Sequence, residues 1–278
     1  MTFWEHLQEF RRCVVRIFII IVAISLVCFI FGFEQYNVKG YHLWLPFHMY
    51  EVFGYTFPFL SLDITNNFSS IVFRKMFDDL APNNIQLIMI APYDALIANL
   101  KISIFLGIII GMPSIIYEIS RFIGPGLYKR EKTMVLKIIG PTTILFLAGC
   151  AFSYFIITPF TITFLYGYGE SMGAETFVSI SDFITFVLIF TIAFGIIFEL
   201  PVVMTALTSL GIVQPLFWKE HWRIALFIMI IIAALITPDA SGITQVMVVG
   251  PMLLLYIIGY YISKYVHGRN EKRAKLID

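Results

Sequence analysis

Long apolar runs separated by short polar segments dominate the pattern of this chain. About 20 apolar residues cross a hydrocarbon core of roughly 30 Å as a helix, and five runs come close to that length. A sixth run measures only about 20 Å at roughly 1.5 Å per residue, so it needs a thinned bilayer or protein contacts around it. We therefore predict six transmembrane helices, the fifth unusually short, at residues 14–33, 96–117, 138–158, 183–203, 224–236 and 243–262.

Lys and Arg gather in one set of the segments that join these runs. With six spans both chain ends lie on the same side of the membrane, and cytoplasmic segments of membrane proteins carry an excess of Lys and Arg. We therefore expect a multi-pass protein of the cell membrane with both termini, including a tail at 263–278, in the cytoplasm. The side of the termini holds all of the 19 Lys and Arg residues except Lys39, Arg74, Lys75 and Lys101.

The segment 34–95, between the first two spans, lies on the outer side in this arrangement. It is rich in Tyr and Phe, whose amphipathic rings suit the headgroup layer, so we expect an interfacial cap there. A seventh span within this segment is the less favoured alternative, because it would invert the charge assignment downstream. We find no internal repeat of the kind that builds inverted-repeat transporters.

Composition agrees with a chain that has lipid as its main solvent. Of its 278 residues 59% are apolar and 13% charged, against about a quarter charged in soluble domains. This excludes a disordered chain and a disulfide-rich secreted module, and it argues against a soluble α/β enzyme. The three cysteines, Cys13, Cys28 and Cys150, lie in or beside apolar runs and are expected to be core residues. We predict one integral membrane domain over residues 1–278.

Motifs of enzymes and cofactor sites are missing from the sequence. There is no phosphate-binding loop, no dinucleotide fingerprint and no H-E-x-x-H motif, and the five histidines lack metal-ligand spacing. We therefore expect no enzymatic activity, no metal or cofactor, and no nucleic-acid partner.

Acidic residues near the cytoplasmic ends of the predicted spans are the first candidates for function. Glu9 precedes the first span and Glu131 the third, so both should lie at the membrane surface. Carboxylates there could bind a cationic peptide, most naturally through arginine. The competing interpretation is local charge pairing, for example of Glu9 with Arg12 at i,i+3. The cytoplasmic acids that precede the tail are Glu5, Glu9, Glu118, Glu131 and Glu220.

Glu199 differs from these acids because it lies inside an apolar span, two residues before Pro201. An ionisable group at this depth is costly and should face the protein interior or a wet cavity. Pro201 leaves a backbone carbonyl without its usual donor and bends the helix. Two interpretations remain open: a neutral Glu bonded to this loosened backbone, or a polar site in a lipid-embedded concavity.

Two proline turns have mainly structural roles in our interpretation. The first, with Pro125 and Gly126, breaks the helical pattern before the third span. The second, with Pro238 and Asp239, forms a sharp turn on the outer face, where Asp239 could cap the helix that follows.

Five motifs occur in order along the chain: His6-Leu7-Gln8-Glu9-Phe10-Arg11; Ala91-Pro92-Tyr93-Asp94 with Lys101; Phe122 to Glu131, with Pro125-Gly126-Leu127-Tyr128 between them; Phe198-Glu199-Leu200-Pro201; and Thr237-Pro238-Asp239 with Gln245 and Pro251. In this order on six predicted spans they resemble the TatC family, the multispanning subunit of the twin-arginine protein translocase, over about residues 5–262. The chain departs from the family in Asp94, which replaces Glu, in Cys13 and Ile257, which replace a frequent basic residue and a frequent Glu, and in one missing proline.

The resemblance implies a function and roles for the matching residues. TatC-like proteins bind signal peptides with adjacent arginines. Together with single-helix subunits of the TatA and TatB type, they pass folded proteins across the membrane on the proton-motive force. Glu9 and Glu131 would form the acidic surface for the two arginines, supported by Arg11 and Phe122. Glu199, beside Pro201, would meet a partner's transmembrane helix, and the short fifth span would contribute to a concave, all-α bundle.

Two other functions stay open on the residues alone. An ion- or proton-coupled small-molecule transporter would suit Glu199 beside a proline-broken helix, but it predicts a second acid deep in a span, which the sequence lacks. A membrane scaffold that only assembles other subunits is the third possibility. Discrimination between Arg-Arg and Lys-Lys peptides separates the translocase subunit from both.

Overall fold

The computed structural model describes most of the chain. It leaves out residues 1–2, 33, 39–40, 46, 53–54, 61–65, 82–85, 124–128, 174–176, 238–241 and 275–278, and it describes only the backbone of residues 3, 123, 129–138, 270–274 and the remaining residues of 34–60. The chain divides into two compact units, one of residues 1–122 and 165–188, the other of residues 123–164 and 189–278.

Helices form most of the described structure, and five of them are long and apolar enough to cross a membrane. They are Trp4–Ile30, Asp94–Phe122, Ile139–Ser171, Ile180–Ser209 and Ile243–Arg269, and Trp222–Ile236 is a shorter apolar helix. Each contains most or all of a predicted run. Their outward apolar side chains, such as Phe155 and Leu235 at 70% and 82% exposure, need a lipid environment.

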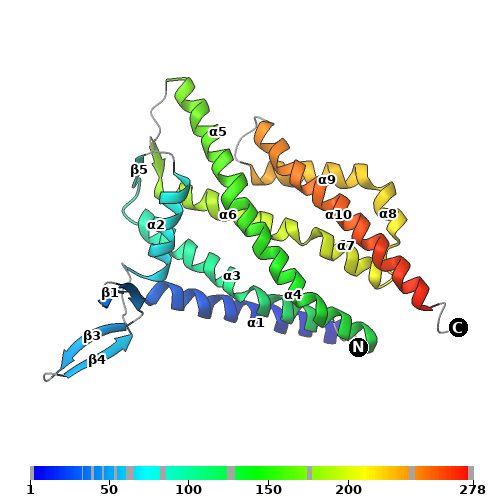
Figure 1. The fold of residues 1–278 in the computed structure, drawn as a ribbon, viewed down its shortest axis with the longest axis horizontal. Helices are drawn as coiled ribbons and strands as arrows, with labels where there is room; N and C mark the ends of the chain where they lie inside the picture. The colour runs from blue at the N-terminus through cyan, green and yellow to red at the C-terminus, as the bar shows by residue number, and fades with distance from the viewer. Residues whose placement is uncertain are drawn as a thin grey trace. The chain divides into compact units, whose positions relative to one another are not determined.

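In the first unit, α1 (Phe3–Ile30) packs along α3 (Asp94–Ile123) (Figure 1). The two helices approach closely at Gly107, where an added Cβ would lie 2.7 Å from the carbonyl oxygen of Ile21. That carbonyl also accepts a hydrogen bond of 2.7 Å from Ser25 of its own helix. Small residues at such contacts let two backbones come together in a membrane protein.

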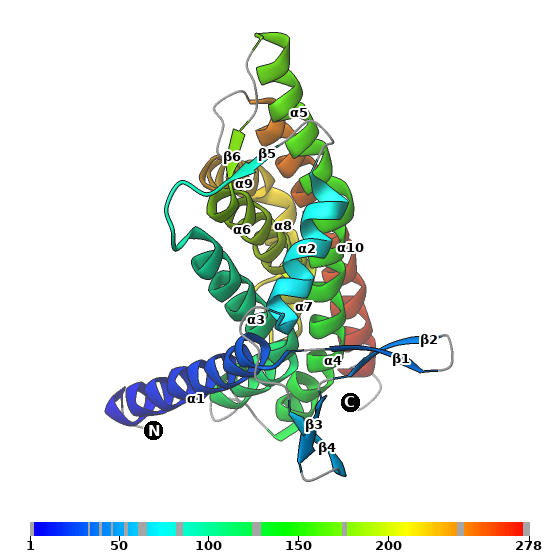
Figure 2. The ribbon, with the colours of Figure 1, turned by 90° about the vertical axis from the view of Figure 1, so that its left-hand side faces the viewer.

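The described residues of 34–60 form two antiparallel pairs of strands rather than helices, so the all-α prediction holds for the spans but not for this segment (Figure 2). The first pairs β1 (Glu34–Val38) with β2 (Tyr41–Leu45), and the second pairs β3 (Phe47–Val52) with β4 (Tyr55–Leu60). Aromatic residues favour strands, which explains why the aromatic segment adopts this form.

The helix α2 (Phe68–Leu80) follows the hairpins and is tied to α1. Its N-cap residue Asn67 accepts a hydrogen bond from the Ser70 amide at 2.8 Å and donates one to the Phe29 carbonyl at 2.6 Å. The strands β5 (Gln86–Ile88) and β6 (Phe177–Ser179) then pair in parallel (Figure 2). Beside them Lys101 of α3 donates to Ser181 and Thr185, both at 2.8 Å, at the start of α6 (Ile180–Phe198).

The helix α4 (Lys129–Phe152), in the second unit, continues through a π-helical turn, η2 (Ser153–Ile157), into α5 (Thr158–Ser171), whose residues from 165 onward belong to the first unit. The predicted span 138–158 therefore ends where the helix only changes its hydrogen-bond pattern. Two glycines bring α4 and α6 together: an added Cβ would lie 2.5 Å from the Phe194 oxygen at Gly149 and 2.6 Å from the Phe146 ring at Gly195.

Four further helices complete the second unit: α7 (Leu200–Ser209), α8 (Pro215–Glu220), α9 (Trp222–Ile236) and α10 (Ile243–Ala274). Figure 1 shows α10 along α7 and α9. The indole of Trp218 in α8 donates to Thr208 at 3.1 Å, and the Tyr256 hydroxyl of α10 donates to the Trp218 carbonyl at 2.6 Å. The short helix α8 is thereby linked to α7 and to α10.

Candidate functional site

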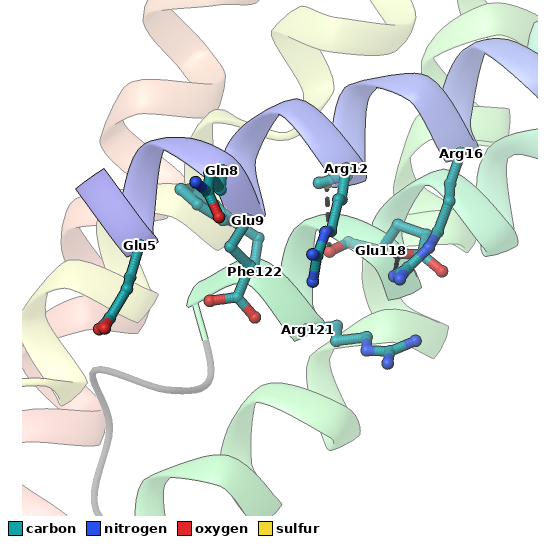
Figure 3. Close-up of a pocket in the computed structure, with 9 residues that line it drawn as sticks. Glu5, Gln8, Glu9, Arg12, Arg16, Glu118, Arg121 and Phe122 are labelled. Atoms are coloured by element: carbon teal, nitrogen blue, oxygen red, sulfur yellow. Dashed lines mark hydrogen bonds and ion pairs between the residues drawn. The ribbon is translucent and has the colours of Figure 1, made fainter. Parts of the chain in front are cut away.

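A polar pocket of about 300 Å³ lies between the first turns of α1 and the last turns of α3 (Figure 3). Both helices belong to the first unit. The pocket brings carboxylates and guanidiniums together at the ends of two apolar helices. Its lining residues are Glu5, Gln8, Glu9, Arg12, Cys13 and Arg16 of α1, with Glu118, Arg121 and Phe122 of α3.

An ion pair between Arg16 and Glu118 lines the pocket. Arg16 Nη1 lies 3.0 Å from Glu118 Oε2, and the two side chains are 43% and 11% exposed. The neighbouring thiol of Cys13 donates to the Glu118 carbonyl oxygen at 3.5 Å. Glu118 is therefore held to α1 through both its side chain and its backbone.

Glu9 lines the same pocket but, unlike Glu118, takes part in no ion pair within the described chain. Its Oε2 is buried and has no hydrogen-bond partner among the residues that the structure describes. The i,i+3 pair with Arg12 does not form within the described chain, although both residues line the pocket. A buried carboxylate oxygen without a donor is costly, and Oε2 of Glu9 is in this position among the described residues.

Aromatic rings border the pocket beside Glu9. The Phe122 ring stacks on the His6 ring at a centroid distance of 4.6 Å and lies 5.5 Å from the Phe10 ring. Phe122 therefore lies in the same pocket as Glu9, and its role in peptide binding stays a prediction. Arg11, by contrast, is exposed and is not among the lining residues.

The other predicted pocket acid, Glu131, lies in the first turn of α4, in the second unit, and its side chain is outside the described residues. The turn residues Pro125 and Gly126, and likewise Pro238 and Asp239, lie outside the described residues altogether. Their predicted roles stay predictions.

Glu199 occupies the junction between α6 and α7, where Pro201 follows in the first turn of α7. Both carboxylate oxygens of Glu199 are buried. They lie near the Phe146 backbone, but neither makes a hydrogen bond of ordinary geometry within the described chain. The interpretation of Glu199 as a side chain bonded to the loosened backbone therefore finds no partner among these residues.

The sequence did not single out Glu118, Arg16 or Cys13 as site residues. Glu118 stands four residues before Phe122, which places both on one face of a helix, so this spacing could have shown it. The approach of Arg16 could not have been predicted, because it depends on how α1 and α3 pack. Among the described residues no group of His, Cys, Asp and Glu could hold a metal ion.

A known protein family matches this chain over most of its length. The family model described as "Sec-independent protein translocase protein (TatC)" matches residues 5–251. The chain belongs to the TatC family. A TatC protein of Cenarchaeum symbiosum is 35% identical over 99% of this chain and 97% of its own length. That of Aquifex aeolicus is 35% identical over 69% of this chain and 79% of its own length.

A solved structure supports the assignment of the chain to the TatC family. The crystal structure described as "Twin Arginine Translocase Receptor- TatC" superposes with a TM-score of 0.72 at 29% identity, covering 94% of this chain and 99% of that one. The family resemblance read from the five motifs is confirmed, and the chain is a multi-pass, mostly helical member of a protein-transport family.

Proposed function

We propose that this TatC protein recognises twin-arginine signal peptides and, with single-helix partner subunits, transports folded proteins across the cell membrane on the proton-motive force. The family membership supports the transport function, and the similar crystal structure is that of a twin-arginine translocase receptor. The peptide site in this proposal is the pocket between α1 and α3, with Glu9 as its principal acid.

The observation that carries the proposal is Oε2 of Glu9, which is buried and has no hydrogen-bond partner in the part of the chain that the structure describes. A guanidinium offers a rigid fork of donors that satisfies a carboxylate through two hydrogen bonds, and such charge-assisted bonds are strong. The ammonium of lysine lacks this fork. A pocket of this kind therefore favours arginine over lysine at the same net charge. Glu131 supplies a further carboxylate in this proposal, and Arg11 and Phe122 support the site.

The second part of the proposal concerns Glu199 and Pro201. A carboxylate without a hydrogen-bond partner in a membrane-spanning helix is costly, and such groups mark functional sites. A polar side chain on the transmembrane helix of a partner subunit would supply the missing hydrogen bond. We infer that this junction is the contact for a single-helix partner.

The membrane arrangement in this proposal has six spans, with α9 (Trp222–Ile236) as the short fifth. The termini lie in the cytoplasm because Lys and Arg are concentrated on their side. The turns at Pro125, Gly126, Pro238 and Asp239 reverse the chain between spans, and the short α9 thins one wall of a concave bundle.

Peptide binding by the detergent-solubilised full chain tests the proposal. The unaltered protein should bind a labelled Arg-Arg signal peptide more tightly than its Lys-Lys counterpart. Glu9→Gln should weaken Arg-Arg binding about tenfold or more, because one member of a buried charge pair is lost. Fluorescence anisotropy measures both effects. Equal binding of the two peptides would overturn the proposal in favour of a scaffold or a small-molecule transporter.

A further inference from the structure

The ion pair between Arg16 and Glu118 lies in the same pocket as Glu9 (Figure 3). We propose that Glu118 is a second guanidinium-binding carboxylate of the peptide site, and that Arg16 occupies it as a replaceable internal ligand. A peptide arginine then displaces Arg16 and takes its place on Glu118. This inference rests on the proposed function, because it assigns a specificity-determining residue to the same site.

The two members of the pair differ in how easily they give up their partner. The Glu118 side chain is 11% exposed, whereas that of Arg16 is 43% exposed. A buried carboxylate that loses its cation is strongly destabilising, so Glu118 always needs one. A half-exposed guanidinium on a long stem reaches water at little cost. Arg16 can therefore leave Glu118 when another cation takes its place, whereas Glu118 is not left without a cation.

The backbone around Glu118 keeps the carboxylate in place during such an exchange. The residue as a whole is 8% exposed on α3. Its carbonyl oxygen accepts the hydrogen bond from the Cys13 thiol on α1. When Arg16 leaves, Glu118 is thus still held between the two helices.

Glu118 also has the right neighbours for a peptide site. It precedes Phe122 by four residues on α3 and shares the pocket with Glu9, which projects from α1 toward α3 (Figure 3). Among the described residues, the pocket thereby offers one carboxylate whose Oε2 has no hydrogen-bond partner and one whose cation can be exchanged. Two adjacent arginines present two guanidiniums, and each can meet one of these acids.

Because Arg16 and the peptide compete for Glu118, substitutions of Arg16 and of Glu118 should change peptide binding in opposite directions. Loss of the Arg16 guanidinium makes the Glu118 carboxylate available and tightens peptide binding. Loss of the carboxylate removes one contact of the peptide and weakens binding. Because lysine lacks the guanidinium fork, Glu118 also increases the preference for Arg-Arg over Lys-Lys.

The test uses the full chain in lipid nanodiscs, with a labelled Arg-Arg peptide and fluorescence anisotropy. Arg16→Gln should lower the dissociation constant about two- to fivefold, the range of a partly exposed ion pair. Glu118→Gln should raise it by about the same factor or more. The double variant should bind like Glu118→Gln alone, because Arg16 has no other role in binding. Arg16→Gln that weakens binding or leaves it unchanged would overturn the inference.

Arg12→Gln is the matched control, since Arg12 lines the same pocket and the variant removes the same charge. If reduced repulsion of a cationic peptide were the whole effect, Arg12→Gln would tighten binding as much as Arg16→Gln. Arg16→Gln would then also tighten binding in the Glu118→Gln background. Either result overturns the inference.

A folding defect is separated from a binding effect by two further measurements. The size-exclusion profile and the unfolding temperature show whether each variant is folded. The variant Arg16→Lys retains the positive charge but lacks the guanidinium fork. Arg16→Lys should tighten binding less than Arg16→Gln, and it takes over the test if Arg16→Gln does not fold. No tightening by Arg16→Lys in that case would overturn the inference.

Failure of the proposed function gives a different result from failure of this inference. In the first case the unaltered protein does not prefer Arg-Arg to Lys-Lys, and Glu9→Gln has no effect. In the second case both of those effects are present, but Arg16→Gln and Glu118→Gln leave the dissociation constant unchanged.

Discussion

Three carboxylates in the described helices have different surroundings, and these differences decide their roles. Oε2 of Glu9 is buried without a hydrogen-bond partner in the described chain, Glu118 pairs with Arg16, and Glu199 has neither oxygen satisfied within the described residues. A buried acid needs a donor or a cation. The two incompletely satisfied acids are therefore the places where a ligand gains most, and our proposal assigns a peptide to Glu9 and a partner helix to Glu199.

The residue-scale prediction for Glu199 concerns partner subunits. Glu199→Ala should reduce co-purification of a single-helix subunit about tenfold or more, because a charge-assisted hydrogen bond of about 1.5–3 kcal/mol is lost. Binding of an Arg-Arg peptide should stay unchanged. Val203→Ala is the control, since Val203 is exposed one turn further along α7. Equal partner yield from Glu199→Ala and the unaltered protein would contradict the assignment.

At the scale of elements, glycine contacts set the distance between helices. Gly107 brings α3 against the backbone of α1, and Gly149 brings α4 against the backbone of α6, where Gly195 makes room for the Phe146 ring. Without a hydrophobic force between helices in lipid, such close packing is a main source of association. The α1–α3 contact also positions the pocket that we propose as the peptide site, because its lining residues extend from the ends of the same two helices.

Gly107→Ala tests this contact. The added methyl would meet the Ile21 carbonyl at 2.7 Å, and overpacking of this kind costs about 1–3 kcal/mol. We expect a lower unfolding temperature and weaker peptide binding, measured on the purified protein. Gly167→Ala is the matched control, because an added Cβ there meets nothing within 4 Å. Equal unfolding temperatures of the two variants would show that the contact does not determine helix spacing.

Hydropathy predicted the apolar core of each span but not the ends of the helices. The first run was predicted to begin at residue 14, whereas α1 begins at Phe3. Residues 3–30 contain neither Pro nor Gly, so nothing in this segment breaks the helix where the apolar run starts. The hairpins of residues 34–60 were not predicted, because strand pairing depends on contacts that an aromatic segment does not specify by itself.

At the scale of the whole molecule, the concentration of Lys and Arg on one side determines the expected orientation. The end of α5 should then be outside and α8 in the cytoplasm. Ser171 and Lys219 are exposed residues of these two helices. The native cysteines, each 6% exposed, give a low background for labelling.

Thiol labelling of intact cells tests this orientation. A membrane-impermeant maleimide should label Ser171→Cys directly, and it should label Lys219→Cys only after the membrane is permeabilised. The unaltered protein is the control for reaction of the buried native cysteines. Direct labelling of Lys219→Cys with protection of Ser171→Cys would invert the topology and place the peptide pocket on the outer side.

The sequence by itself determined the apolar helices and the family, because hydrophobic runs and short motifs are local properties of the chain. It also indicated Glu9 and Phe122, which lie in such motifs. Only the tertiary structure decided that Arg16 meets Glu118, a residue 102 positions away. That contact depends on the rotation and spacing of two helices, which approach closely at Gly107 and which no local pattern encodes.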